Sequence, residues 1–482
     1  MTLTILLISR IRKIYCRKNT LQHGERIISG IKNINVIDGQ KVRNKVKKKK
    51  QVKNKRKMWL WLVMGSVILL AAVITVLVYM RLSANDTYLT DISSITITAE
   101  ESYEAGEALN TGDVIVTASG VDAQGKRTEV ELSNNQYSLL PEQVPEHGHE
   151  FEITATLNTD KSIQASADAL ISREELMRYD VGRTDPDQVQ AVLYDNGDLE
   201  IVGTGEVKNY NNGEIPWKND DIMYLTWIDS YAEVESMDYW FSGSEVFRGM
   251  MCQVPDTVRS MVQTFYGCTS MQTVPDMTTG VNLEDITGCY SGSGVTAGGT
   301  FPGNLKTAEN AYKDCMALIH AADASACVRL TNMMNCYSGC SALSDTSTPD
   351  CVLRMDGAYQ NCLNIKEVTI PSKVETLNST FSGCTALVTV QGDIPNTCTD
   401  LSSTFKDCKF LAGDLRIHCA AQSLSGTFSG AAKNGSGLTV LLSWEGDTAA
   451  YQDADNLLQN IMETVETQGK TDGSNIQIQL AE

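Results

Sequence analysis

The sequence predicts a multidomain chain with a single transmembrane helix, an all-β sandwich and a solenoid of about nine coils. The coils are expected to form a parallel β-sheet, with a cap at each end. Three observations support this fold class. The 482 residues divide into a basic part and an acidic part at an uncharged apolar segment. Alternating polar and apolar residues follow, and a repeat of about 23 residues then fills much of the remaining chain.

Charge divides the chain at the apolar segment. Residues 1–57 hold 18 Lys or Arg and two acidic residues, whereas residues 82–482 hold 21 Lys or Arg and 57 acidic residues. The acidic part argues against a nucleic-acid partner. We expect residues 1–57 to be a disordered, basic cytoplasmic tail held by anionic lipid, and a nucleic-acid-binding arm is the alternative.

The segment 58–80 contains 23 residues without a charge. As a helix it would be about 34 Å long, enough to cross a hydrocarbon core of about 30 Å. Trp59, Trp61 and Tyr79 lie near its ends, where aromatic rings favour the membrane interface. We expect an uncleaved single-pass anchor in a cell membrane, with the N-terminus cytoplasmic and the C-terminal domains extracellular. The alternative is a cleaved signal peptide, whose apolar region is normally about 7–15 residues long.

Residues 92–172 alternate polar and apolar side chains in short runs that are separated by turn residues. This alternation predicts a small β-sandwich. The sequence around Tyr103, Gly106 and Leu109, followed by VIVTASGVDAQGKRTEV, resembles the bacterial immunoglobulin-like domains of surface proteins. The resemblance implies that this region is a spacer.

Two short segments lie between the sandwich and the repeats. Residues 173–188 are expected to form a connector, and the spacing of Ser172 and Glu175 favours a brief helix at its start. Residues 189–230 contain a hairpin pattern with turn residues at 195–198. This hairpin is expected to cap the N-terminal end of the repeats.

A repeat fills residues 231–434. Apolar residues recur four and seven positions before an aromatic residue, and proline recurs ten positions before it in five of nine units. One such unit cannot bury these positions alone, but stacked coils align them into one core. The aromatic residues are Phe241, Phe265, Tyr290, Tyr312, Tyr337, Tyr359, Phe381, Phe405 and Phe428.

The last segment, residues 435–482, is expected to cap the C-terminal end, because an open stack exposes apolar positions and strand edges. Strand-like runs at 438–444 and 476–480 flank one amphipathic helix. The apolar residues of this helix recur at helical spacing from Tyr451 to Val465.

The segments IPSKVETLNSTFSGCTALVTV and LTNMMNCYSGCSAL resemble the BspA-like leucine-rich repeats of bacterial and protozoan surface proteins. The hairpin LYDNGDLEIVGTGEV, with Pro216 and Trp217, is similar to the segment that commonly precedes such repeats. The third unit departs from the pattern with SGSG, and the ninth carries Ala431 and Asn434 in place of Cys and Leu. The resemblance implies adhesion to host or neighbouring-cell macromolecules.

The chain has 14 cysteines, and six of them share one repeat position, three residues after the aromatic residue. Neighbouring coils would place their Cα atoms about 4.8 Å apart, so geometry alone does not exclude disulfides between them. Cysteine is common in protein cores, and we expect mostly reduced thiols. The six are Cys268, Cys315, Cys340, Cys362, Cys384 and Cys408.

No hydrolase, P-loop, dinucleotide-binding or EF-hand motif occurs in the sequence. His147 and His149 flank a glycine beside two glutamates, but a third defined metal ligand is missing, and a solvated loop is the preferred interpretation. His418 precedes Cys419 within the repeats, which favours a structural histidine over a thiol nucleophile. We expect no enzyme activity, no cofactor and no metal.

These observations predict a membrane-anchored cell-surface protein whose repeats bind an extracellular protein or glycan. Its expected partners are the lipid bilayer, through residues 58–80, and an extracellular macromolecule. An envelope structural or sensory protein without an adhesive ligand is the alternative. The sequence singles out no ligand-binding residue, and it indicates neither the ligand nor the oligomeric state.

Overall fold

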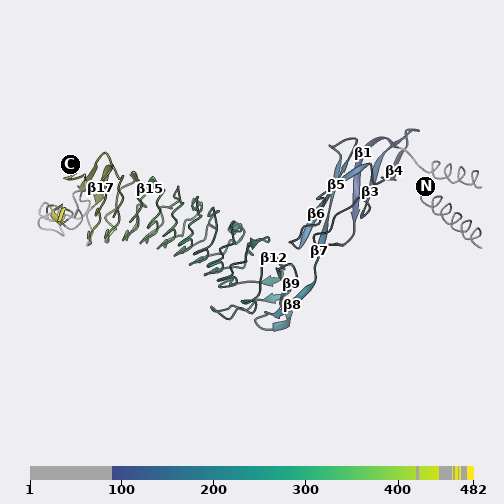
Figure 1. Cartoon of the computed structure of the whole chain (residues 1–482), viewed down its shortest axis with the longest axis horizontal. Helices are drawn as coiled ribbons and strands as arrows, with labels where there is room; N and C mark the ends of the chain where they lie inside the picture. Colours follow the sequence, from purple (N-terminus) through teal and green to yellow (C-terminus); the bar gives the residue numbers. More distant parts are fainter. Residues whose placement is uncertain are drawn as a thin grey trace, which may run out of the picture. The chain divides into compact units, whose positions relative to one another are not determined.

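The computed structural model describes residues 89–418, 423–443, 459, 462–464, 466–467 and 475–481. The chain divides into two units, Met1–Tyr88 and Leu89–Glu482, and every described residue lies in the second. The described residues of this second unit form almost entirely β-strands and irregular coils (Figure 1).

The single transmembrane helix of the predicted fold class is not supported. Within the described residues, no helix is long and apolar enough to cross a membrane, for which about 20 consecutive apolar residues are needed. The segment 58–80 and the basic tail 1–57, on which the prediction rests, lie outside the described residues. The fold class is corrected to nearly all β over the described residues, and the predicted single-pass membrane localisation is likewise not supported.

The first part of the described chain is a sandwich of two β-sheets (Figure 1). Alternate strand residues, such as Ile95, Val116 and Ile153, point into a shared core because successive side chains face opposite sides of a strand. The immunoglobulin-like class of this sandwich stays a prediction. One sheet has the order β1 (Leu89–Ala99), β3 (Val114–Asp122), β4 (Arg127–Glu131), and the other has the order β2 (Ser102–Glu104), β7 (Gln164–Ser172), β6 (Glu150–Leu157), β5 (Tyr137–Leu140).

The segment after the sandwich contains a strand where the sequence predicts a brief helix. β8 (Glu175–Asp180) pairs antiparallel with β9 (Val189–Tyr194), and the short helix η1 (Pro186–Gln188) lies between them. The segment is extended because the edge of β9 provides partners for its backbone N–H and C=O groups. Arg173 lies between Ser172 and Glu175, whose spacing predicts the helix, and it forms ion pairs with two buried carboxylates.

A five-stranded sheet leads from the sandwich into the coils, in the order β14–β12–β10–β9–β8. β9 and β10 (Asp198–Gly203) form an antiparallel hairpin, as the turn residues at 195–198 predict. β10, β12 (Tyr224–Ile228) and β14 (Gly249–Met250) are parallel neighbours, so this sheet continues directly into the first coils.

Trp217 closes the first coil together with the short parallel pair β11 (Gly205–Glu206) and β13 (Ala232–Glu233). The Trp217 ring lies edge-on to the Trp240 ring with a centroid distance of 5.6 Å, and its Nε1 donates to the Trp240 carbonyl at 3.0 Å. A large buried aromatic residue therefore covers the apolar positions that begin the stack.

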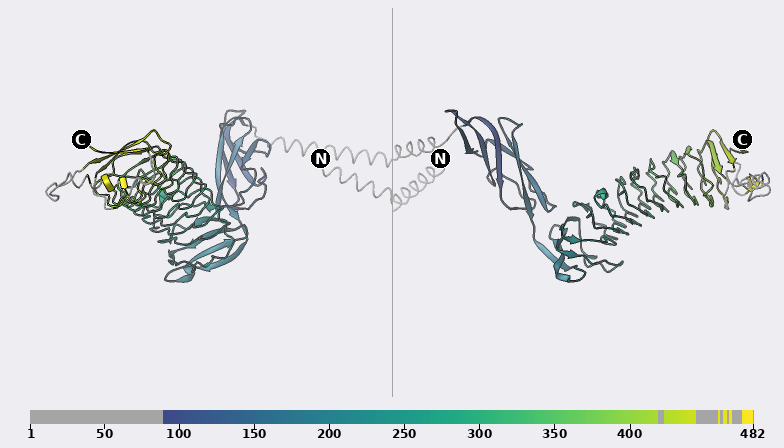
Figure 2. Two further views of the ribbon diagram at one scale, coloured as in Figure 1. Left: turned by 60° about the vertical axis from the view of Figure 1, so that its left-hand side comes forward. Right: turned by 180° about the vertical axis from the view of Figure 1, so that it is seen from behind.

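The coils lie side by side (Figure 2) and are joined mainly by single parallel β-bridges. The expected continuous sheet is reduced over most of the described coils to one bridge per pair, five residues before the aromatic residue. A longer parallel pairing joins β15 (Glu367–Thr369) to β16 (Thr389–Gln391). The bridges run through Ser236, Ser260, Asp285, Thr307, Asn332, Arg354, Thr376, Asp400 and Ser423.

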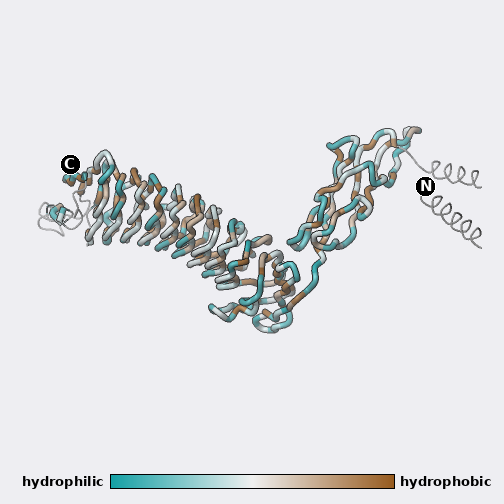
Figure 3. The backbone as a smooth tube through the Cα atoms, viewed as in Figure 1, coloured by the Kyte–Doolittle hydropathy of each residue, from teal (hydrophilic) through white to brown (hydrophobic). Residues whose placement is uncertain are grey.

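Inside the coils, the nine aromatic residues of the repeat form one continuous stack. Neighbouring rings from Phe241 to Phe428 have centroid distances between 5.0 and 5.9 Å. Apolar residues and polar residues alternate along each coil (Figure 3), as a core on one side of the backbone requires. The repeat positions seen in the sequence therefore become layers of one core.

The cysteines of the repeat lie in this core as hydrogen-bond donors. The Sγ of each of the six cysteines that follow the aromatic residue by three positions donates to the carbonyl of the aromatic residue in the preceding coil, at 2.9 to 3.2 Å. Buried threonines such as Thr380 and Thr404 bind the carbonyls of Met355 and Leu377 in the same manner. All twelve described cysteines are free, and burial raises the pKa of Cys384 to about 12.

Each coil turns at two positions with left-handed backbone, two residues before and two residues after the aromatic residue. Their φ angles lie between 50° and 82°, a range that favours Gly, Asn and Asp. The first set is Tyr239, Gln263, Gly288, Asn310, Asn335, Gly357, Ser379, Ser403 and Gly426. The second set is Gly243, Gly267, Gly292, Asp314, Gly339, Asn361, Gly383, Asp407 and Gly430.

At the C-terminal end, β17 (Gly413–His418), β18 (Leu438–Ser443) and β19 (Ile476–Leu480) form a parallel sheet. Residues 462–464 are helical, and Met462 packs against the core of the coils. Most of the predicted amphipathic helix lies outside the described residues.

Candidate functional site

Two carboxylates are buried at the point where the sandwich meets the first coils. Asp198 and Glu200 lie two residues apart on β10, so their side chains face the same side of the sheet. Their side chains are 0% and 2% exposed. Buried carboxylates are unfavourable unless charged partners and hydrogen bonds compensate them.

Arg173 is the first of these partners. Its Nη1 donates to Asp198 Oδ2 at 2.8 Å, and its Nη2 donates to Glu200. The guanidinium carbon lies 4.1 Å from the centre of the Tyr194 ring, a cation–π contact. The Tyr194 hydroxyl donates to Glu200 at 3.1 Å, and burial raises its pKa to about 12, so it remains a donor at neutral pH.

Two histidines reach the same carboxylates from the loop before β6. His147 Nδ1 lies 2.8 Å from Asp198 Oδ1, and His149 Nδ1 lies 2.9 Å from Glu200 Oε1. Burial on its own would raise the pKa of Glu200, but hydrogen bonds from His149 and Arg173 outweigh burial and hold the pKa below its usual range. We call these five side chains the junction cluster: His147, His149, Arg173, Asp198 and Glu200.

The sequence predicts that His147 and His149 lie in a solvated loop, but the structure places both rings against buried carboxylates. The loop packs on the sheet, and the His149 ring stacks on Trp227 at 4.3 Å. Among the described residues, no group of three or more His, Cys, Asp or Glu is arranged to hold a metal ion. The sequence signal that would have pointed to the cluster is the run Asp198-Leu-Glu200, two acids inside an otherwise apolar strand.

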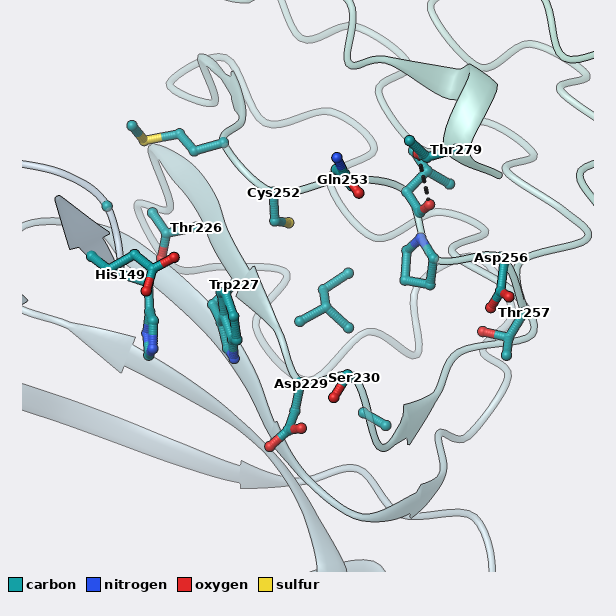
Figure 4. A pocket seen from close by; sticks show the side chains of 17 residues that line it. His149, Thr226, Trp227, Asp229, Ser230, Cys252, Gln253, Asp256, Thr257 and Thr279 are labelled. Carbon is teal, nitrogen blue, oxygen red and sulfur yellow. Dashed lines mark hydrogen bonds between the residues drawn. The ribbon is translucent and has the colours of Figure 1, made fainter. Parts of the chain in front are cut away.

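A pocket with a volume of about 610 Å³ lies beside the junction cluster (Figure 4). Three segments line most of it: residues 148–150 at the start of β6, residues 226–230 at the end of β12, and residues 251–257 after β14. Trp227 lies at one end of the pocket and Asp256 at the other. We call it the Trp227 pocket.

The Trp227 pocket has an aromatic and acidic lining. Three carboxylates line it, from Glu150, Asp229 and Asp256, and no Lys or Arg is among its lining residues. In the described part of the chain, none of the three carboxylates forms an ion pair. Neutral polar groups complete the lining, from Thr226, Ser230, Gln253, Thr257 and Thr279.

Cys252 and His149 both line this pocket, but they do not form a nucleophile–base pair. Cys252 Sγ donates to the Leu225 carbonyl at 3.7 Å, and His149 Nδ1 contacts Glu200. Burial raises the pKa of the Cys252 thiol to about 12, so it is protonated at neutral pH. The lining supplies groups that recognise a ligand rather than a thiolate that attacks one.

His418 binds residues of the neighbouring coils. Its Nε2 lies 3.1 Å from Asp393 Oδ2, and its Nδ1 lies 2.9 Å from Ser443 Oγ. This Ser–His–Asp contact does not match a hydrolase triad, because Asp393 is 53% exposed and meets Nε2 instead of Nδ1. Cys419, the other residue of the sequence hypothesis, lies outside the described residues.

No family model and no curated protein matches this chain. Solved structures similar to it include leucine-rich-repeat proteins of bacteria. A leucine-rich repeat protein from Eubacterium ventriosum is 16% identical, with 53% of this chain and 95% of that chain covered and a TM-score of 0.25. The pneumococcal vaccine antigen PcpA is 11% identical, with coverages of 61% and 97% and a TM-score of 0.26. A leucine-rich cell surface protein from Faecalibacterium prausnitzii is 16% identical, with coverages of 57% and 97% and a TM-score of 0.18. These low TM-scores leave the function of this chain to be argued from its own residues.

Proposed function

We propose that this chain is a cell-surface adhesion protein that binds an extracellular protein or glycan. One observation carries the proposal, namely the lining of the Trp227 pocket. It combines an aromatic ring, carboxylates, hydroxyls and an amide with a cysteine that stays protonated and is bound to a backbone carbonyl. Concave sites with a few fixed polar groups hold a ligand, and this one lacks an activated nucleophile in its lining.

The outer positions of the coils support the same function. Inner positions keep one kind of side chain from coil to coil, whereas the bridge position changes its chemistry, for example between Ser260, Asp285, Asn332 and Arg354. These side chains lie outside the core, so packing does not fix their chemistry, and the backbone holds them at regular spacing. Some of them also bind the neighbouring coil, as Ser260 does with Asp238 and Asn332 with Glu309. The resemblance of the repeats to BspA-like repeats also favours adhesion.

A binding screen with the full-length chain tests the proposal. The immobilised chain is presented to one panel of extracellular-matrix proteins and one of glycans, and dissociation constants are measured for each hit. We expect at least one specific ligand, with at least a tenfold loss of affinity for Trp227→Ala. Phe410→Ala is the matched control, because Phe410 is an exposed aromatic residue on another coil, and it should leave the affinity unchanged. If no member of either panel binds, adhesion is the wrong function.

A further inference from the structure

The Trp227 pocket lies in the strongly acidic part of the chain. Residues 82–482 hold 57 acidic residues and 21 basic residues. A charge imbalance of this size produces a negative potential that attracts positively charged ligands and repels anionic ones. Any ligand of this pocket must first approach through that potential.

Within the described residues, no arginine forms an ion pair with a carboxylate of the pocket, although Arg183 and Arg259 line a neighbouring pocket together with Asp256. Arg183 is directed to Glu206 and Glu235, at 3.5 and 2.8 Å, and both of these residues lie outside the lining of the Trp227 pocket. Both terminal nitrogens of Arg173 are bound to carboxylates of the junction cluster. The carboxylates of Glu150 and Asp229, which line the Trp227 pocket away from these arginines, are therefore available to a positive charge supplied by a ligand, and Asp229 Oδ1 also accepts from the Tyr231 amide at 3.1 Å.

Trp227 offers an aromatic face to the same charge. His149 stacks on one side of its ring with an interplanar angle of 14°, and Figure 4 shows other lining residues, such as Gln253 and Ser230, on the opposite side. The face of an indole ring attracts ammonium and guanidinium groups, and Trp is the strongest of the aromatic side chains in this respect. A guanidinium can stack on the ring while its edge donates hydrogen bonds to carboxylates.

We propose that the Trp227 pocket binds a lysine or arginine side chain of a partner protein, with arginine bound more tightly. This inference rests on the proposed function and narrows its ligand from a protein or glycan to a protein segment with a basic residue. A neutral glycan would use the same tryptophan and hydroxyls, but it would leave the carboxylates of Glu150 and Asp229 without a counter-charge.

Three peptide probes test the inference with the full-length chain. They are acetyl-Gly-Gly-X-Gly-Gly-amide with X as arginine, lysine or citrulline, which has nearly the shape of arginine without its charge. Affinities are measured by titration calorimetry at 50 mM and 300 mM salt. We expect arginine to bind at least tenfold more tightly than citrulline, with lysine between them, and the arginine affinity to fall severalfold at the higher salt. Equal affinities for arginine and citrulline would overturn the inference.

Matched variants place the binding in the pocket. The triple variant Glu150→Gln, Asp229→Asn, Asp256→Asn should weaken the arginine peptide at least tenfold. Its control, Glu101→Gln, Glu152→Gln, Asp168→Asn, makes the same change in net charge on the exposed sandwich surface and should not weaken it by more than about twofold. Equal losses in the two triples would show a long-range charge effect and would contradict the pocket assignment.

The failure of this inference and the failure of the proposed function give different results. If the glycan panel yields a ligand whose affinity depends on Trp227 while the arginine peptide does not bind, the cationic ligand is wrong and adhesion stands. If the basic peptide binds and no macromolecule does, the pocket assignment stands and adhesion is wrong. Circular dichroism of each variant confirms that lost binding is not lost folding.

Discussion

The junction cluster and the stack of coils both bury polar groups, but they compensate them differently. The junction holds a few charged side chains that differ from one another. One of them, Glu200, contacts three partners: Arg173, His149 and Tyr194. The stack holds many neutral donors, each with a backbone carbonyl as partner, and the same contact recurs in coil after coil. Charge is concentrated at one place, whereas neutral hydrogen bonding is spread along the stack.

The two regions are therefore expected to respond differently to the loss of one polar contact. In the stack, a lost thiol or hydroxyl contact removes one of many similar neutral hydrogen bonds, and neighbouring coils keep theirs. In the junction, the loss of Arg173 leaves two buried carboxylates without their main counter-charge. The following substitutions test this contrast in order of expected effect.

Replacing Arg173 with methionine should give the largest loss. We expect a destabilisation of about 3–5 kcal/mol at the junction, because one partner of a buried ionic group is removed and the others remain. Hydrogen exchange at the amide of Gly148, which donates to Asp198 at 3.1 Å, measures the local opening, and urea unfolding of the full chain measures the total.

Arg183→Met is the control for this substitution. Arg183 forms ion pairs with Glu206 and Glu235 at the surface, and exposed pairs contribute about 0–1 kcal/mol. Equal losses for the two arginines would mean that burial of the charges adds nothing, and the contrast between junction and surface would fail.

Leu377→Ala should give the second largest effect, about 3 kcal/mol, because this side chain is fully buried in the stack and its removal leaves a cavity. Hydrogen exchange should rise in the neighbouring coils while the Gly148 amide keeps its protection. Leu363→Ala, at an exposed position of the preceding coil, is the control and should cost less than about 1 kcal/mol. Loss of protection at Gly148 in Leu377→Ala would show that stack and junction open as one unit.

Acid should weaken the junction through Glu200. Because its folded pKa is held below the unfolded value of 4.5, its contribution to stability is present above that value and is lost as the pH falls through the lower folded pKa. We expect exchange of the Gly148 amide, corrected for its intrinsic pH dependence, to reveal increased opening between about pH 5 and 3. Glu200→Gln should reduce this dependence. An unchanged pH profile in that variant would assign the acid effect to other carboxylates.

The inner positions of the stack could be predicted because the repeat shows each of them nine times. Phe241 to Phe428 were visible as one position by spacing alone, and their rings form one stack. The reduction of the sheet to single bridges could not be predicted. The runs around Val368 and Val390 look like ordinary strands and do pair, but most other coils are joined by one bridge only.

The junction cluster could not be predicted because it occurs once and its members are far apart in the sequence. His147 and Asp198 are 51 residues apart, and Arg173 lies between them in a segment that the capping pattern assigned to a helix. No periodicity marks such a contact. Only the two acids on the apolar strand β10 signalled a buried charge, and a single sequence does not reveal its partner. The composition of residues 58–80, in contrast, gave a clear prediction that the described structure does not support.

The smallest expected effect is at the left-handed turns of the coils. Asn361 has a φ of 60°, and glycine holds the same repeat position in neighbouring coils at Gly339 and Gly383. Asn361→Ala should cost about 1 kcal/mol, because alanine lacks the local hydrogen bonding by which asparagine tolerates this backbone. Asn361→Gly should be close to neutral, since glycine adopts the conformation without strain but loses more entropy on folding. Gln360→Ala, one residue earlier and without a positive φ, is the control for side-chain removal. Urea unfolding that ranks Asn361→Gly below Asn361→Ala in stability would show that side-chain contacts, rather than backbone strain, decide this position.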